Sequence, residues 1–266
     1  EFDKVWIDDK RALSDVSGTF QREGNIWRTV YLKSILDGAT ALNVELKPGL
    51  NGANRTVDIS TADAGVVLRT LGFYDNMQGG ALQLTGTFDD SHPDHPLKGR
   101  LLIRDYRVLK APALAHLVSI MALTGILDAL QGDGLGFAVL DIPFTMRSGV
   151  VEIADARAAG TSLGFTASGT VYTHADIVDL EGTVVPAYAI NSALGRIPIL
   201  GNIFTGGEKG SGLFAANFRM TGPQEDPKVD VNPLSALAPG FLRRLFGVFG
   251  DSPAAPKDLN PVPTPK

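Results

Sequence analysis

Runs of alternating apolar and polar residues follow one another along most of the chain. They are separated by short segments rich in glycine, proline, asparagine and aspartate, which favour turns. Alternation with a period of two is typical of a strand with one buried face, because successive side chains point to opposite sides of a sheet. We expect strands at residues 2–8, 25–36, 40–46, 55–59, 80–88, 97–108, 135–146, 150–158, 162–172, 177–185, 212–220 and 228–231.

Most links between these strands are short. Asp37–Gly38 and Ser148–Gly149 are turn sequences, and the longer link 91–96 contains two prolines. Strands joined by such links lie side by side and run antiparallel. We therefore predict a mainly β fold, a curved antiparallel sheet that forms an open gutter or groove, with a few short amphipathic helices.

One face of this sheet is expected to be apolar throughout. In residues 140–146 the apolar positions alternate with polar ones such as Asp141, and residues 214–220 repeat the pattern around Asn217. Periodicity alone leaves open whether this face packs under helices as an ordinary core or faces lipid. We predict one continuous apolar interior made by Leu82, Leu84, Leu140, Ile142, Phe144, Leu163, Phe165, Phe214 and Phe218.

Helical segments interrupt the sheet. Thr61 is expected to cap a helix over residues 62–71, with Asp63 in its first turn and Gly72 as a left-handed stop. A further short helix is expected near residues 187–194.

The apolar stretch 111–130 has the length of a membrane span. It contains polar residues such as His116 and Asp128 and lacks a basic flank. Pro112 suits the first position of a helix, and the helical pattern restarts after Gly125. We therefore expect a buried or interfacial helix pair.

A last helix is predicted at residues 239–249. Its apolar side chains lie along one side, with two arginines beside them, so it either covers the open end of the groove as a lid or contacts a membrane surface. We favour the lid, because one short helix buries too little apolar area for stable membrane binding alone. Residues 1–249 are expected to form a single β-groove domain, and the proline-rich residues 250–266 a disordered tail. The lid or membrane-contact residues are Phe241, Leu242, Leu245, Phe246 and Phe249.

Composition narrows the function. Of the 266 residues 44% are hydrophobic, which is enough for a core, while the formal net charge of −5 argues against a nucleic-acid partner. The absence of cysteine excludes disulfides, thiolate catalysis and zinc-thiolate sites. We expect no cofactor and no metal. Because the chain enters a strand directly from Glu1, we expect it to be part of a longer protein.

Two segments have the residue types of chemical sites. Residues 89–95 gather aspartates and histidines that can bind metals, but their prolines and turn-forming aspartates favour a plain loop. Residues 206–212 are rich in glycine but lack the order and the following helix of a phosphate-binding loop. No Gly-x-Ser-x-Gly elbow with partner histidine and aspartate in a strand-turn-helix context is found in the sequence. We expect that the protein is not an enzyme.

Several segments resemble the C-terminal region of the AsmA-like family of bacterial envelope proteins. The most specific are residues 182–201, where a strand runs into a short helix, and residues 229–246, where a second strand ends in an apolar helix. Residues 60–69, 74–82 and 111–137 are also similar to this region. The resemblance covers the chain from about Asp58 to Phe246.

The resemblance implies a periplasmic protein that is anchored in the inner membrane by a segment absent from this chain. Its sheet would form a groove, apolar inside, that carries glycerophospholipid between the inner and outer membranes and supports outer-membrane biogenesis. A twisted antiparallel sheet with one apolar face can curl into such a trough, and acyl chains can complete its core. The expected partner is a phospholipid or another acyl lipid, with a membrane surface and envelope proteins as further candidates.

Two other classes of function remain open. A structural or regulatory module for envelope assembly would use exposed strand edges to pair with partner proteins. A hydrolase of envelope lipids or glycans would need a cleft with convergent carboxylates whose pKa values are displaced.

Overall fold

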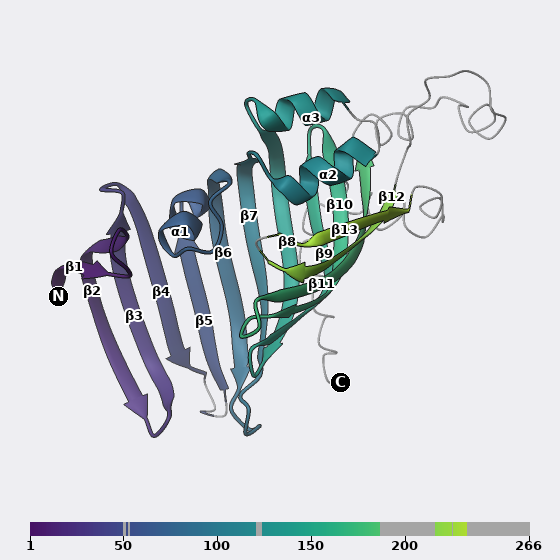
Figure 1. Cartoon of the computed structure of the whole chain (residues 1–266). Helices are drawn as coiled ribbons and strands as arrows, with labels where there is room; N and C mark the ends of the chain where they lie inside the picture. The colour runs from purple at the N-terminus through teal and green to yellow at the C-terminus, as the bar shows by residue number, and fades with distance from the viewer. Residues whose placement is uncertain (50–51, 53, 121–123, 187–215, 225, 233–266) are drawn as a thin grey trace, which may run out of the picture.

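The chain folds into one open, curled antiparallel sheet of 13 strands, in which each strand pairs with its neighbours in sequence (Figure 1). The computed structural model describes residues 1–49, 52, 54–120, 124–186, 216–224 and 226–232. The curved antiparallel sheet predicted from the alternation is thereby confirmed. The strands are β1 (Phe2–Trp6), β2 (Ala12–Glu23), β3 (Ile26–Leu36), β4 (Thr40–Pro48), β5 (Asn54–Thr61), β6 (Met77–Asp89), β7 (Leu97–Val108), β8 (Leu135–Arg147), β9 (Val150–Gly160), β10 (Leu163–Tyr172), β11 (Ile177–Pro186), β12 (Ala216–Pro223) and β13 (Lys228–Asn232).

Strand β2 was not expected from the sequence. Its pattern is weak, because large apolar side chains are few and the strand contains Gly18. The pattern is also broken at Asp15, which has a left-handed φ of 48° at the point where the pairing with β3 shifts register. Pairing with both β1 and β3 holds this segment in the sheet, so its strand character comes from its neighbours.

The tight turns follow the sequence signals. Ser148 and Gly149 alone link β8 to β9, and both have positive φ, 50° and 78°, as a type I′ hairpin turn requires. Asp37 and Gly38, between β3 and β4, also have positive φ. These turns twist in the same sense as the strands, so they favour antiparallel neighbours.

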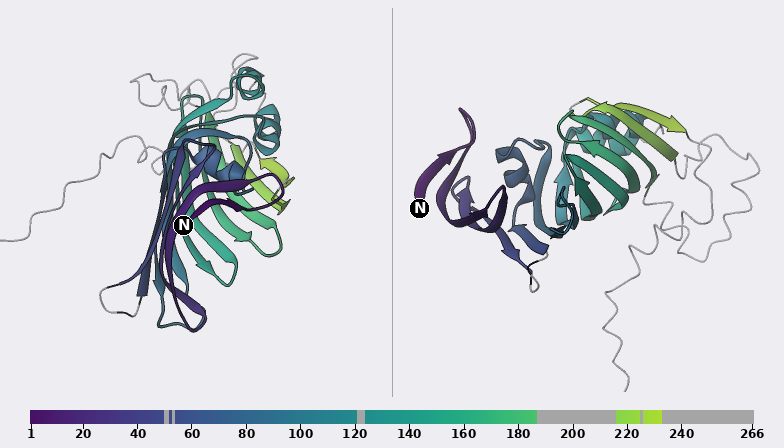
Figure 2. Two further views of the ribbon diagram at one scale, coloured as in Figure 1. Left: turned by 90° about the vertical axis from the view of Figure 1, so that its left-hand side faces the viewer. Right: turned by 90° about the horizontal axis from the view of Figure 1, so that it is seen from below.

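The register of the sheet brings the apolar positions of successive strands onto one face. Leu82 lies opposite Ile103, and Ile103 lies opposite Leu140. The row continues across β9 to β12 through Ala158, Phe165, Val184 and Ala216. The sheet curls around this face, as the view from below in Figure 2 shows. The apolar face is therefore the concave one.

The alternation along the strands is broken at one level across β6, β7 and β8. Gly80 and Asp105 have positive φ there, and Asp105 separates Ile103 from Tyr106. These two side chains are both buried although they differ in parity. In β8 the same change of parity separates the buried Phe137 from Leu140, where the pairing with β9 shifts register. On either side of this irregularity, odd- and even-numbered residues therefore exchange faces. As a result, both Ile103 and Tyr106 of β7 point to the concave side.

In the described part of the chain, three short helices lie on the sheet: α1 (Ala64–Thr70), α2 (Pro112–Ile120) and α3 (Thr124–Gln131). The predicted cap of α1 was wrong, since Asp63 is the N-cap and accepts a hydrogen bond from the Val66 backbone N–H at 3.0 Å. Thr61 is held in β5 by pairing with strands on both sides, so it lies too early to cap the helix. Gly72, with φ of 76°, ends the helix as expected.

The expected helix pair at 111–130 is present as α2 and α3. Leu117, Val118 and Leu130 are buried in the same core as the apolar face of the sheet. Within the described ranges, none of the helices combines the length and the apolar character that crossing a membrane requires.

Several predictions fall outside the described residues. These are the helices near 187–194 and 239–249, the tail 250–266, Phe214, and the lid or membrane-contact residues Phe241, Leu242, Leu245, Phe246 and Phe249. They stay predictions.

Candidate functional site

An apolar cavity of about 280 Å³ lies between helix α2 and the concave face of the sheet. Its walls come from α2 and from strands between β6 and β13, including Met77 on β6 and Val229 on β13. In a flat sheet these two strands would be about 34 Å apart, because neighbouring strands are spaced about 4.8 Å. Here the curl brings β13 into contact with α2, which closes the trough at this level.

The described residues that were predicted to bind lipid share the concave face. Leu140, Phe165 and Phe218 line the cavity itself. Leu82 and Leu163 are buried in the core beside it, and Leu84 is half-buried against that core. The remaining two, Ile142 and Phe144, are half-buried on β8 and lie opposite Leu101 and Gly99 of β7.

Aromatic rings from β7, β8 and β10 contact one another on the concave face. Tyr106 and Phe137 stack with their ring centroids 5.2 Å apart, and Phe137 meets Phe165 edge to face at 5.5 Å. The second contact crosses the intervening strand β9, where Ala158 is buried between the flanking side chains. A small residue on β9 therefore lets rings from β8 and β10 meet.

Glycines within the strands leave space on the concave face for aromatic rings of the neighbouring strands. Gly99 lies opposite Phe144, and a Cβ atom added to this glycine would lie 2.6 Å from the ring. Gly182 lies opposite Phe218, where the corresponding distance is 2.8 Å. Each ring thus leans over the glycine of the neighbouring strand instead of standing up into the trough. Sequence analysis missed these glycines, although an isolated glycine inside an alternating run is the signal for such a close approach.

The convex face is polar. Arg100 and Asp141 form a bidentate pair across β7 and β8, with a contact of 2.6 Å from Nε to Oδ1. Arg219 and Asp179 form a similar pair across β12 and β11 at 3.1 Å. One face of the sheet is therefore charged and hydrated, while the other carries hydrocarbon.

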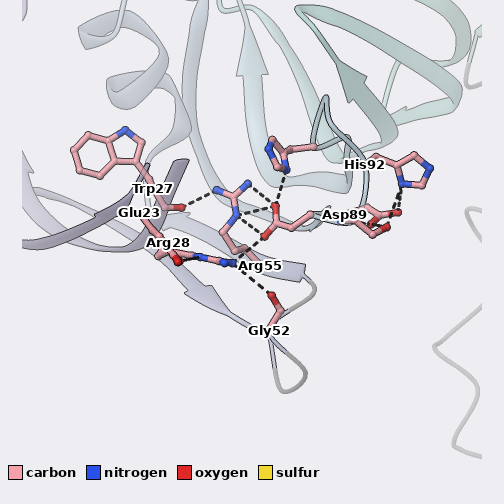
Figure 3. A network of polar contacts seen from close by, with 10 residues as sticks. Glu23, Trp27, Arg28, Gly52, Arg55, Asp89 and His92 are labelled. Carbon is pink, nitrogen blue, oxygen red and sulfur yellow. Dashed lines mark hydrogen bonds and ion pairs between the residues drawn. The ribbon is translucent and has the colours of Figure 1, made fainter. Parts of the chain in front are cut away.

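The loop of residues 89–96 has a structural role at the opposite end of the trough from α2 (Figures 1 and 3). Arg55 binds both carboxylate oxygens of Asp90, with the shortest contact at 2.8 Å, and donates a hydrogen bond to the Trp27 carbonyl at 2.7 Å. Its guanidinium group also lies 4.5 Å from the centre of the Phe88 ring. This network ties the loop between β6 and β7 to strands β3 and β5.

The charge of Asp90 is stabilised in this network. Burial tends to raise the pKa of Asp90, but hydrogen bonds from Arg55 and the electrostatic effects of Arg55, His95 and Arg28 outweigh burial and hold the pKa below its usual value. In the part of the chain that the structure describes, no group of three or more acidic or histidine side chains is arranged to hold a metal ion. The aspartates of the loop therefore serve ion pairing and turn formation.

Comparison of the chain with protein-family models, with curated proteins and with solved structures finds no match. The AsmA-like resemblance thus rests on the sequence segments given above, and much of its two most specific segments lies outside the described residues.

Proposed function

We propose that the concave face binds acyl chains and that the protein carries glycerophospholipid between the inner and outer membranes in the periplasm. The apolar cavity under α2 is the observation that supports this most. The described residues of its lining are almost entirely hydrocarbon, and beyond Leu140 the same face of β8 carries the half-buried Ile142 and Phe144. The resemblance to AsmA-like proteins supports the compartment and the class of lipid.

The expected strength of binding suits transfer. Burying one methylene group contributes about 0.8 kcal/mol, so eight methylenes of a chain contribute about 6 kcal/mol before the cost of ordering the ligand. Binding of this strength holds a lipid in the trough but still allows it to dissociate. A trough open along one side also lets a headgroup stay in water while the chain is buried.

We propose that the protein is not an enzyme. Among the described residues, the carboxylates whose pKa values are clearly displaced are those of Asp8, Asp89 and Asp90, and all three are lowered. Nearby arginine, serine, histidine and backbone groups account for these directions, and none of the three carboxylates lines the cavity. A hydrolase would need acids that converge on the bound substrate.

The test is lipid capture by the purified protein. Native mass spectrometry should find co-purified acyl lipid. Photo-crosslinkers at Leu140 and Phe144 should then capture acyl chains, whereas a crosslinker at Asp141, on the convex face of the same strand, should not. Equal capture from both faces, or no lipid in any preparation, would refute the proposal.

Strand β1 supports a second candidate function, that of an interaction module. All five of its residues are exposed, including the large side chains of Phe2 and Trp6, and it forms one edge of the sheet. An exposed edge can pair with a strand of a partner protein or with a preceding strand of the same longer protein. Crosslinkers at Phe2 and Trp6 should trap an envelope protein if this function is the correct one, and should trap none if the edge has no partner.

A further inference from the structure

We infer that the side chains of Tyr74 and Tyr106 bind the oxygen-bearing end of an acyl chain in the cavity under α2. The ligand group is a carbonyl or carboxylate oxygen, supplied by an ester of a phospholipid or by a free fatty acid. This inference rests on the proposed function and adds the part of the lipid that the cavity recognises.

The chemistry of the lining singles out the two tyrosines. Every other described residue of the lining is alanine, valine, leucine, phenylalanine or methionine. Tyr74 and Tyr106 therefore bring the hydrogen-bond donors among the side chains that line this cavity. A ligand site of this kind is mostly apolar, with a few polar groups that fix the orientation of the ligand.

Both tyrosines lie on the same side of the cavity. Tyr74 follows helix α1 and precedes β6, and Tyr106 belongs to β7. The facing wall, from β10 to β13, includes Phe165, Val184 and Val229, and its described residues contribute no hydroxyl group to the lining. A chain that enters the cavity is thus oriented, with its oxygen-bearing end toward β6 and β7 and its hydrocarbon toward β12 and β13.

The protonation state of these residues favours donation to an acceptor. Burial raises the pKa of Tyr74 and of Tyr106, and the nearby Tyr74 raises the pKa of Tyr106 further. Both phenols are therefore neutral donors at physiological pH. Neither hydroxyl is among the described buried polar atoms that lack a hydrogen-bond partner, so both can be reached from outside the packed core. A ligand oxygen can accept a hydrogen bond from them.

The ring of Tyr106 is held in place by its surroundings. It stacks on Phe137, and a Cβ atom at Gly80 would lie 3.0 Å from the Tyr106 Cβ atom. Asp105, with φ of 56°, sets the turn of the backbone just before it. The donor is thus fixed before a ligand arrives, which lowers the entropy lost on binding.

The size of the cavity fits one chain. At about 280 Å³ it lies just below the usual range of about 300–1,000 Å³ for ligand sites. Part of one chain fills this space, while a second chain and a headgroup remain in the open trough.

The test compares probes of equal chain length with and without an oxygen acceptor. Palmitic acid, 1-palmitoyl lysophosphatidylethanolamine and hexadecane are titrated against the wild-type protein, Tyr74→Phe, Tyr106→Phe and the double variant. Tyr172→Phe, at the exposed end of β10, is the matched control. Phenylalanine keeps the ring and its packing, and circular dichroism checks the fold of each variant.

Each cavity variant should bind the acceptor-bearing probe about 2- to 10-fold more weakly, the range expected for one hydrogen bond. Hexadecane binding and the control should be unchanged. An effect confined to palmitic acid identifies a free fatty acid as the ligand, and one confined to the lysolipid identifies an esterified chain. Equal affinities of the variants and the wild type would overturn the inference while leaving the proposed function intact. If the wild type binds none of the three probes, the proposed function falls with it.

Discussion

Replacing Arg55 with methionine tests whether the buried ion pair holds the end of the trough opposite α2. Both side chains of the pair are 6% exposed, and Arg55 makes hydrogen bonds to Asp90 and to the Trp27 carbonyl. The substitution keeps much of the side-chain volume but leaves Asp90 buried with its charge poorly compensated. We expect the free energy of unfolding to fall by about 3–5 kcal/mol, the range found when one partner of a buried pair is removed.

The assay is urea unfolding followed by tryptophan fluorescence. The chain has two tryptophans, and Trp27 belongs to this network. The double variant Arg55→Met with Asp90→Leu removes both charges and should recover most of the lost stability, because no uncompensated charge remains. A loss below about 1 kcal/mol for the single variant, or a double variant no more stable than the single one, would refute the reasoning.

The pH dependence gives an independent check. In the wild type the folded pKa of Asp90 is lowered, so its contribution is present above its unfolded pKa of about 3.9 and is lost as the pH falls through the folded pKa. Burial raises the pKa of Asp90, and in the variant Arg55 no longer opposes this effect. The folded pKa of Asp90 therefore rises. The deficit of the variant should therefore be largest near neutral pH and shrink as the pH is lowered toward 4. A deficit that is constant over this range would show that lost packing, and not charge, is the cause.

Three further predictions concern the trough. Phe144→Asp should abolish lipid capture and lower soluble expression only slightly, because Phe144 is half-buried on the concave face; complete loss of soluble protein would indicate an ordinary core. Gly99→Ala should lower stability by about 1–3 kcal/mol in urea unfolding, since the new methyl group would lie 2.6 Å from the Phe144 ring and 2.8 Å from the Thr85 carbonyl oxygen. It should also reduce crosslinking of lipid at Leu140, because the Phe144 ring would be pushed into the trough. Gly136→Ala is its control, because a Cβ atom there meets nothing within 4 Å, and equal effects would contradict the proposed role of Gly99. Deletion of residues 239–266 separates the two roles predicted for the last helix: lost liposome flotation supports membrane contact, unchanged flotation with faster lipid exchange supports the lid, and no change in either refutes both.

Alternation and turn residues were enough to predict most of the sheet. They carry this information because period-two patterning and left-handed turns are local properties of the chain. The same patterns placed Leu140, Phe165 and Phe218 on one apolar face, and the register agrees. Strand β2 was missed because its own pattern is weak and its pairing partners hold it in place.

The cavity itself could not be read from the sequence. It depends on the curl that brings β13 against α2, and curl is a property of the whole sheet. Tyr106 was overlooked for a more local reason. Strict alternation from Ile103 would turn Tyr106 to the convex face, whereas the left-handed backbone at Asp105 turns it inward. One backbone irregularity thus decides which wall of the trough carries a polar group.

The strictly sequential order of the strands bears on how the chain reaches its native state. Each strand pairs with the one synthesised just before it, so no strand has to wait for a distant partner. Pairings of this kind are local in sequence and have a low entropic cost of loop closure. The chain is synthesised from its N-terminus, so each new strand can pair with the free edge of the strand made just before it. At each stage the next strand covers the C-terminal edge of the growing sheet, while no described strand pairs with the outer edge of β1.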